Sequence, residues 1–312
     1  MKHRLLQFDR MQASLEAALA ERYDVHPLWT ESDQKDFLAR RGHEFVALVT
    51  RAASGADAAL IDALPSLRVI SSFGVGLDKL DLDAARRRGI AVGYTPDVLN
   101  DAVADTAFGL LLDVARGLSA ADRFVRRGEW PTGTFPLSTQ VSGKRLGILG
   151  LGRIGRVIAR RASGFDMEVR YHNRRELADA PYAYEASLEE LARWADFLVI
   201  ASAGGPEARH LVSANILDAL GPSGFLINIS RGTVVDETAL VDALAQRRIA
   251  GAGLDVFENE PHVPQALFGL DNVVLLPHMA SATHETREAM AALVLENLAH
   301  FFEHGTPRAS AI

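Results

Sequence analysis

The stretch LGILGLGRIGRVIA at residues 146–159 decides the fold of one half of this chain. Its apolar beginning predicts a strand and its end opens a helix, with the pattern G-x-G-x-x-G between them. The first glycine permits a tight turn, the second lets a pyrophosphate approach the backbone, and the third allows close packing of helix on strand. Such turns also occur for packing alone, but strand, loop and helix in this order predict a dinucleotide site. The residues expected to line it are Gly150, Gly152, Arg153, Ile154 and Gly155.

Composition narrows the classes of function. The chain has 312 residues, enough for two domains, and a net charge of −7, which argues against binding nucleic acid through a basic surface. Because it has no cysteine, disulfides, thiolate zinc sites, iron–sulfur clusters and a cysteine nucleophile are excluded. We expect no metal site among the ten histidines. No apolar run reaches the ~18 residues of a membrane span and no secretory signal is recognisable, so a cytoplasmic protein is predicted.

An alternation of strand and helix extends on both sides of the glycine-rich stretch. Short apolar runs predict five strands before it and six from residue 146 onward, separated by segments with helical spacing. This alternation predicts α/β domains with parallel sheets. The expected strands are 4–8, 23–29, 45–49, 67–71 and 90–94 in the first half, and 146–149, 168–172, 196–201, 225–230, 253–257 and 272–276 in the second.

Two longer helices, at 98–116 and about 283–302, fall outside the alternation and are expected to link two domains. We therefore predict a discontinuous substrate-binding domain, residues 1–98 plus 285–312, and an NAD(P)-binding domain at residues 99–284. The predicted fold class is α/β, with two Rossmann-like or flavodoxin-like parallel-sheet domains and an active-site cleft between them.

The end of the second strand in the dinucleotide-binding half predicts the preferred cofactor. It reads Tyr-His-Asn-Arg-Arg at 171–175, whereas NAD-preferring sites carry an acidic residue there for the ribose 2′-hydroxyl. Asn173 can hydrogen-bond a ribose without repelling a phosphate, and Arg174 or Arg175 can pair with a 2′-phosphate. The sequence therefore predicts NADP(H) as the preferred cofactor and NAD(H) as a second one. The alternative is that both arginines are simply solvated.

Three polar residues that follow apolar strands are candidates for catalysis: Arg231, Glu260 and His278. In a doubly wound sheet the carboxyl ends of the strands line the ligand crevice, so all three could face one bound molecule. Hydride transfer to an α-keto acid uses such groups. An arginine grips the carboxylate and carbonyl oxygen, an imidazolium gives a proton, and a carboxylate orients the ring and favours its charged form. Each residue alone has a plainer alternative, as a solvated side chain or a loop hydrogen-bonder.

Six strings of the sequence resemble the D-isomer-specific 2-hydroxyacid dehydrogenases, most closely their glyoxylate/hydroxypyruvate and hydroxyphenylpyruvate reductase branch. The resemblance spans nearly the whole chain, and the combination is far more specific than any one string. The strings are GVGLDKLD at 74–81, TPDVLNDAVADTAFGLLL at 95–112, GKRLGILGLGRIG at 143–155, INISRGTVVDE at 227–237, GAGLDVFENEP at 251–261 and LPHMASATHETREAM at 276–290.

The resemblance implies roles for the candidate residues. By this likeness Arg231 binds substrate, Glu260 pairs with the histidine, and His278 is the acid/base. The backbone amides of Val75 and Gly76 would hold the substrate carboxylate, because a glycine-flanked turn can aim successive N–H groups at an anion. The alternative for this segment is a tight turn without ligand contact.

Four further positions are candidates for binding. Asp255 matches the position that receives the nicotinamide carboxamide in the family, and its competing role is a buried carboxylate satisfied by backbone amides. Ser230 is expected to bind the cofactor. Arg51 ends a first-domain strand and could reach a substrate. Trp130 resembles a loop tryptophan that in some relatives enters the partner subunit's active site, or it packs in a local dimer contact.

Together these features predict an NADPH-dependent reductase that converts a small 2-oxo acid into the D-2-hydroxy acid. Hydroxypyruvate and glyoxylate are the first candidates, and hydroxyphenylpyruvate stays open. The competing hypotheses are a non-catalytic NAD(P)H-sensing scaffold of the same fold, and an oxidation such as that of formate or phosphite. The resemblance also implies a homodimer joined through residues 98–112 and 116–136, although amphipathic spacing could equally bury that helix within one subunit.

Overall fold

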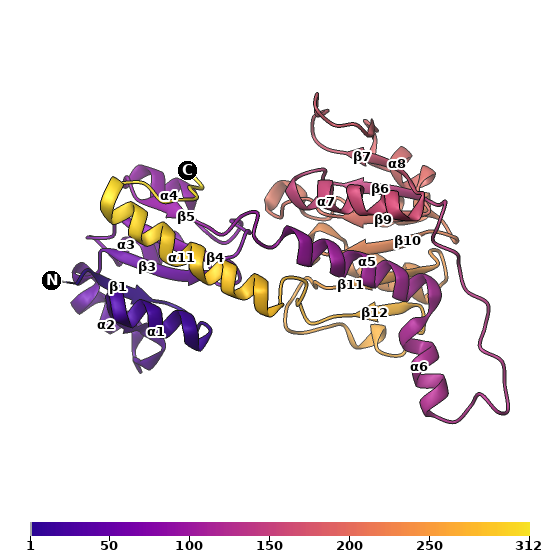
Figure 1. The fold of residues 1–312 in the computed structure, drawn as a ribbon, viewed down its shortest axis with the longest axis horizontal. Helices are drawn as coiled ribbons and strands as arrows, with labels where there is room; N and C mark the ends of the chain where they lie inside the picture. Colours follow the sequence, from indigo (N-terminus) through magenta and orange to yellow (C-terminus); the bar gives the residue numbers. More distant parts are fainter. Residues whose placement is uncertain (1) are drawn as a thin grey trace. The chain divides into compact units, whose positions relative to one another are not determined.

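A computed structural model describes residues 2–312. The chain divides into two compact units, one formed by the residues up to Leu99 with Thr283–Ile312, the other by Asn100–Ala282. Each unit contains one parallel sheet with helices packed on it (Figure 1). The predicted class of two parallel-sheet α/β domains is therefore confirmed.

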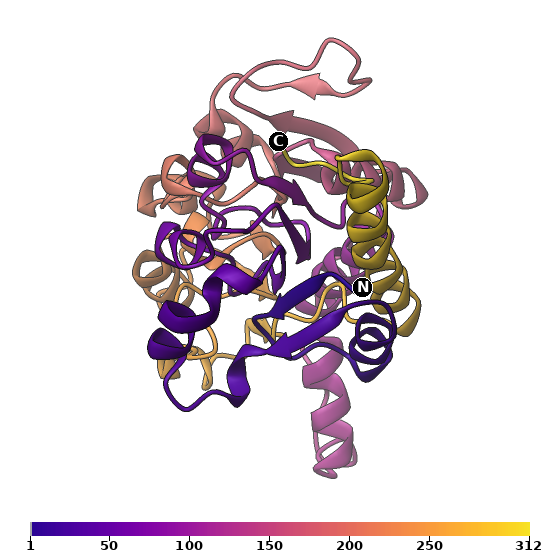
Figure 2. The same cartoon turned by 90° about the vertical axis from the view of Figure 1, so that its left-hand side faces the viewer.

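The first unit is built on a five-stranded sheet with the order β2-β1-β3-β4-β5. Its central strand β3 and the neighbouring β4 are buried except at Arg51, as expected of a parallel sheet covered on both faces. Helices α1 and α11 lie on one side of this sheet, and α2, α3 and α4 on the other (Figure 2). The strands are β1 Arg4–Gln7, β2 Asp24–Pro27, β3 Ala47–Arg51, β4 Val69–Phe73 and β5 Ala91–Gly93. The helices are α1 Ala13–Arg22, α2 Gln34–Arg41, α3 Ala58–Asp62, α4 Leu82–Arg87 and α11 His284–His304.

Helix α11 returns the chain to the first unit. Thr283 caps its N-terminus: the side-chain oxygen of Thr283 accepts the backbone N–H of Thr286. Farther along, the buried Asn297 donates to the carbonyl of Tyr94 at 2.9 Å and accepts from the N–H of Ala309 at 2.8 Å. The last residues of the chain are thereby fixed to the edge of the five-stranded sheet.

The second unit contains seven parallel strands in the order β12-β11-β10-β9-β6-β7-β8. The central strands β9, β10 and β11 are buried at every residue. The strands are β6 Arg145–Leu149, β7 Glu168–His172, β8 Ala183–Tyr184, β9 Phe197–Ile200, β10 Phe225–Asn228, β11 Gly251–Leu254 and β12 Val273–Leu275. The helices are α5 Asn100–Arg116, α6 Leu118–Arg126, α7 Arg153–Ala162, α8 Leu188–Trp194, α9 Ala214–Leu220 and α10 Glu237–Ala245.

The eleven predicted strands all have a counterpart, with ends displaced by a few residues. The two-residue strand β8 was not predicted, because two residues carry no periodicity. The predicted helix 98–116 corresponds to α5, whose apolar face packs on β10, β11 and α7 within the second unit. Gly117, in the left-handed region at φ 64°, then separates it from α6. Among residues 2–312 no helix has the length and apolar character needed to cross a membrane.

Candidate active site

The glycine loop after β6 has the geometry that a dinucleotide needs. A Cβ on Gly155 would lie 2.2 Å from the carbonyl oxygen of Gly150, so only glycine lets α7 pack this closely. Gly150 has φ +100°, and a Cβ there would meet the backbone of Ser202. At Gly152 a Cβ would meet nothing within 4 Å, which leaves the backbone at the start of α7 open to a ligand. The chain therefore fits a pyrophosphate at this loop.

The segment after β7 borders this loop. Asn173 accepts the N–H of Leu151 through its Oδ1 at 2.8 Å, so its side chain holds the loop. Arg174 forms an exposed ion pair with Glu207 at 2.5 Å, and Arg175 is exposed. Strands β7 and β9 are the two neighbours of β6, which leads into the glycine loop. The ion pair therefore joins the segment after β7 to the segment after β9, across the end of β6. The interaction of Asn173 with the loop was not predicted.

His278 and Glu260 form a hydrogen-bonded pair beyond β12 and β11. His278 Nδ1 lies 2.7 Å from Glu260 Oε2, and Glu260 Oε1 accepts the N–H of Phe257 at 3.1 Å. Burial alone would raise the pKa of Glu260, but the hydrogen bond and charge of His278, together with the charge of Arg231, hold it below its ordinary value. The carboxylate is thus kept ionised beside the ring.

The backbone holds His278 in an uncommon conformation. Its φ is 52°, a region that few residues other than glycine adopt, and its N–H donates to the carbonyl of Asp255 at 2.8 Å. Asp255 is completely buried and accepts the N–H groups of Met279 and Ala280 at 2.7 and 3.0 Å. Burial raises the pKa of Asp255, against the effect of these two hydrogen bonds. These contacts correspond to the competing role considered for Asp255, a carboxylate that fixes the turn carrying the histidine.

Arg231 follows β10 in a turn held by Asn228. The Asn228 amide donates to the carbonyl of Arg231 at 3.0 Å and accepts the N–H of Ser230 at 3.1 Å. The Ser230 hydroxyl donates to the carbonyl of Ser202 at 2.6 Å, which joins this turn to the segment after β9. Asn228 was not predicted as a site residue, although a buried polar residue at a strand end is a usable signal. The structure therefore places Arg231, Glu260 and His278 on neighbouring segments of one unit.

The other predicted substrate contacts belong to the first unit. Arg51 is exposed at the end of β3, and Val75 and Gly76 are partly buried in the turn after β4. Arg287, which was not predicted, lies with its guanidinium 5.6 Å from the ring centre of Phe73. Burial, and then the charge of Arg51, lower the pKa of Arg287. Two cations thus lie near each other here, but 236 residues separate them in sequence, so no local pattern could reveal the pair.

An apolar cavity of about 270 Å³ adjoins the His278–Glu260 pair. Its remaining walls come from apolar side chains that follow β11 and from β12, including Phe257, Val263 and Leu275. Phe268 also lines it and is 65% exposed. This cavity was not predicted from the sequence.

The histidine spacing contains one pattern that was not predicted. His300 and His304 lie one turn apart on α11, with ring centres 4.3 Å apart. Glu303 lies between them in the sequence. Across residues 2–312 no group of three or more histidine or acidic side chains has a geometry that could hold a metal ion.

Comparison with known proteins identifies the family. Residues 108–280 match the NAD-binding domain of the D-isomer specific 2-hydroxyacid dehydrogenases. The chain is 52% identical to a hydroxyphenylpyruvate reductase of Plectranthus scutellarioides, over 93% of each chain. It is 49% identical to a glyoxylate/hydroxypyruvate reductase A of Arabidopsis thaliana, also over 93% of each. It is therefore an oxidoreductase with a nicotinamide-dinucleotide domain, and it belongs to the D-isomer specific 2-hydroxyacid dehydrogenase family.

A solved structure extends the comparison to the whole fold. The NADPH-dependent glyoxylate/hydroxypyruvate reductase of Sinorhizobium meliloti, in complex with NADP and malonate, is 40% identical to this chain. The TM-score is 0.91, with 100% of this chain and 97% of that one covered.

Proposed function

We propose that this protein reduces a small 2-oxo acid to the D-2-hydroxy acid with NADPH, and that His278 is the general acid. The observation that carries the proposal is the 2.7 Å hydrogen bond between His278 Nδ1 and Glu260 Oε2, in the same unit as a glycine loop that fits a dinucleotide. When bound, the reduced nicotinamide supplies the hydride. Related chains named as hydroxyphenylpyruvate and glyoxylate/hydroxypyruvate reductases support this choice of substrates.

Each residue of the site has a separate proposed role. Because Nδ1 of His278 faces Glu260, Nε2 is the nitrogen that meets the substrate oxygen and protonates it as the alcohol forms. The ionised Glu260 accepts a hydrogen bond at Nδ1 and fixes the orientation of the ring. Arg231 binds the substrate carboxylate and the carbonyl oxygen, where negative charge develops. We further propose that Arg51 and the amides of Val75 and Gly76 contribute to carboxylate binding.

The cofactor preference rests on Arg174 and Arg175. Both are exposed beside the glycine loop, and the chain has no acidic side chain at Asn173, where one would bind a ribose 2′-hydroxyl and repel a phosphate. A guanidinium forms strong, charge-assisted hydrogen bonds with a phosphate. NADPH is therefore the proposed reductant, and NADH a weaker one.

The proposal is tested by following oxidation of NADPH and NADH with glyoxylate, hydroxypyruvate and hydroxyphenylpyruvate. The apolar cavity beside the catalytic pair is the reason to include the aryl substrate. We expect turnover of at least one of these acids, a D-configured product, and a higher kcat/KM with NADPH. Absence of turnover with all three would contradict the proposal. It would favour the competing idea of a non-catalytic NAD(P)H-sensing scaffold, for which the named relatives give no support.

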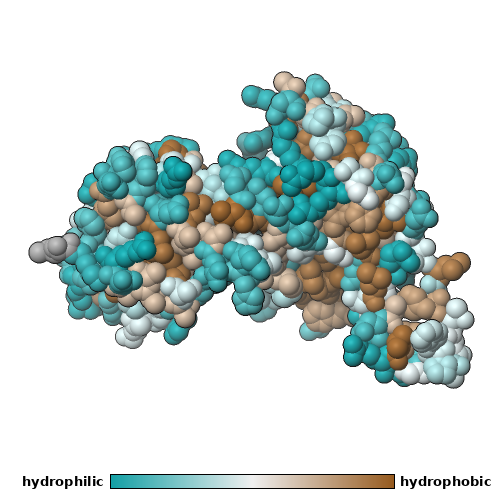
Figure 3. Space-filling view, in the orientation of Figure 1, coloured by the Kyte–Doolittle hydropathy of each residue, from teal (hydrophilic) through white to brown (hydrophobic). Residues whose placement is uncertain are grey.

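We also propose a homodimer. Helix α6 has no buried residue, and its apolar side chains contribute brown patches to the surface in Figure 3. Leu118 and Val125 are each 52% exposed, and Trp130 and Leu137 in the following segment are more exposed still. Burying such side chains against a second copy would remove apolar surface from water. Light scattering should give twice the monomer mass, and a Leu118→Lys/Val125→Lys variant should give the monomer mass.

We place the protein in the cytoplasm, because turnover consumes NADPH that has to be regenerated where it is used. Fractionation of cells that express the protein tests this. Activity confined to a membrane or secreted fraction would contradict it.

A further inference from the structure

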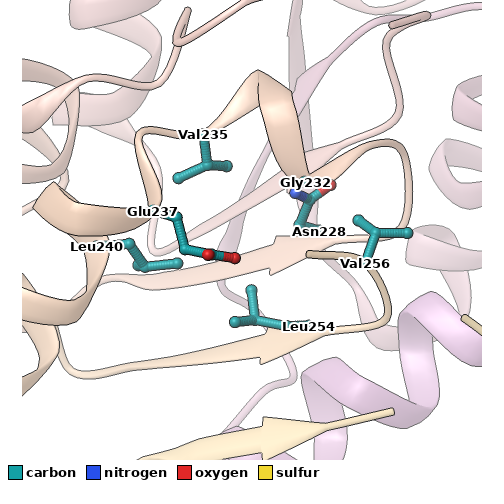
Figure 4. Close-up of a pocket in the computed structure, with 7 residues that line it drawn as sticks. All are labelled: Asn228, Gly232, Val235, Glu237, Leu240, Leu254 and Val256. Carbon is teal, nitrogen blue, oxygen red and sulfur yellow. The ribbon is translucent and has the colours of Figure 1, made fainter. Parts of the chain in front are cut away.

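Glu237 is a partly buried carboxylate to which the mechanism above gives no role. It is the first residue of α10, and its carboxylate points into a small pocket of about 10 Å³ behind the turn that carries Arg231 (Figure 4). Most of the other walls are apolar, among them Leu240, Leu254 and Val256. A carboxylate among such side chains is costly unless it accepts hydrogen bonds, so its presence here requires an explanation.

A short series of hydrogen bonds connects Glu237 to the catalytic pair. The N–H of Glu258 donates to Glu237 Oε1 at 3.0 Å. In the same turn, the N–H of Phe257 donates to Glu260 Oε1 at 3.1 Å, and Glu260 Oε2 lies 2.7 Å from His278 Nδ1. The neighbouring N–H groups of residues 257 and 258 therefore bind two different carboxylates, one from α10 and one from the catalytic pair.

The turn that carries Arg231 packs directly on this segment. A Cβ on Gly232 would lie 1.9 Å from the carbonyl carbon of Phe257 and 2.2 Å from the backbone N of Glu258. The two backbones thus touch with no side chain between them. A displacement of the segment at 257–260 would therefore move both Arg231 and Glu260.

We propose that Glu237 is a positioning residue, which holds the segment 257–260 so that Glu260 faces His278 and the Arg231 turn keeps its place. The inference rests on the proposed function and deepens it. It assigns to α10 the task of fixing the orientation of the acid. Glu237 acts through the backbone of Glu258.

The charged groups around Glu237 fit a role as an acceptor. Burial raises the pKa of Glu237 and the charge of Glu258 acts in the same direction, while the Glu258 N–H opposes them. The Glu258 carboxylate is itself bound by Arg209 and by His210. Nε2 of His210 lies 3.1 Å from Glu258 Oε1. Ionised or protonated, Glu237 keeps an oxygen that can accept the N–H. An amide at this position should therefore serve as well as a carboxylate.

The test compares Glu237→Ala with Glu237→Gln, with Asp242→Ala at an exposed position of the same helix as the control. In Glu237→Ala we expect kcat/KM for the 2-oxo acid to fall about tenfold at neutral pH, the ratio that corresponds to roughly one hydrogen bond. Glu237→Gln should restore kcat/KM, and Asp242→Ala should leave it unchanged.

Hydrogen exchange supplies a measurement that does not depend on turnover. Peptides covering residues 255–262 should exchange faster in Glu237→Ala than in wild type or Glu237→Gln, while the Kd for NADPH stays within about twofold. An unchanged kcat/KM in Glu237→Ala, or a Glu237→Gln variant as impaired as Glu237→Ala, would overturn the inference. Failure of the proposed function is distinguishable, because wild type itself would then show no turnover of a 2-oxo acid.

Discussion

At the scale of single residues, Glu260 orients the ring of His278 and places a negative charge beside it. The hydrogen bond at 2.7 Å fixes which ring nitrogen faces outward, and the N–H of Phe257 fixes the carboxylate in turn. Asp255 secures the turn behind the histidine from a completely buried position. The unusual φ of His278 is thus maintained by hydrogen bonds on both sides of the residue.

The lowered pKa of Glu260 predicts how the pair stabilises the fold. A carboxyl whose pKa in the folded state lies below its ordinary value of 4.5 stabilises the protein above that pH. The stabilisation is lost as the pH falls through the lower, folded-state pKa. Wild type should therefore exceed Glu260→Gln in free energy of unfolding at neutral pH, and the difference should shrink below about pH 4.5.

Urea unfolding of both proteins at neutral pH and at successively lower pH checks this prediction. Glu176→Gln removes the same charge from an exposed position and serves as the control. A difference between wild type and Glu260→Gln that stays constant on acidification would contradict the assignment of the shift to the ionised pair.

At the scale of elements, the segments after β7 and β9 are joined by the ion pair of Arg174 with Glu207. In the proposed cofactor site, Arg174 exchanges this partner for the 2′-phosphate. Glu207→Gln should therefore tighten NADPH binding by up to about fivefold, since an exposed ion pair is worth at most about 1 kcal/mol, and should leave NADH binding unchanged.

Fluorescence titration of both cofactors measures this effect. Asp179→Asn is the matched control. Asp179 also follows β7 and forms an ion pair with Arg156, so this variant removes a comparable ion pair and should alter neither Kd. Equal tightening of NADH and NADPH in Glu207→Gln would mean that Arg174 does not bind the 2′-phosphate.

The elements also show what sequence reasoning can reach. The glycine loop, the strands and the three catalytic candidates follow from local patterns, because apolar periodicity and strand-end polar residues are local properties. The two-residue β8, the bond from Asn173 to Leu151 and the position of Arg287 depend on contacts between distant segments. Asp255 is instructive, since its sequence position fits either of two roles. The hydrogen bonds at Met279 and Ala280 show that its carboxylate holds the turn, while its binding of the nicotinamide carboxamide stays a prediction.

At the scale of the whole molecule, the division into two units predicts an uneven response to cofactor. The glycine loop and the segment after β7 belong to the unit Asn100–Ala282. A ligand that binds only the folded state at 100 times its Kd stabilises that state by about 2.7 kcal/mol. NADPH should therefore raise the unfolding midpoint of this unit.

Scanning calorimetry with and without NADPH tests that expectation, with Arg174→Gln as the comparison. If the two units unfold in separate steps, the step assigned to Asn100–Ala282 by limited proteolysis should move and the other should not. A shift carried by the first unit alone would contradict the placement of the cofactor.

The most direct test of the central claim is the turnover number of His278→Ala with NADPH and the best 2-oxo acid. Loss of a general acid should lower kcat by about 10² to 10⁴, while the Kd for NADPH stays near the wild-type value because the cofactor loop is untouched. A variant that keeps wild-type kcat would contradict the assignment of His278 as the proton donor.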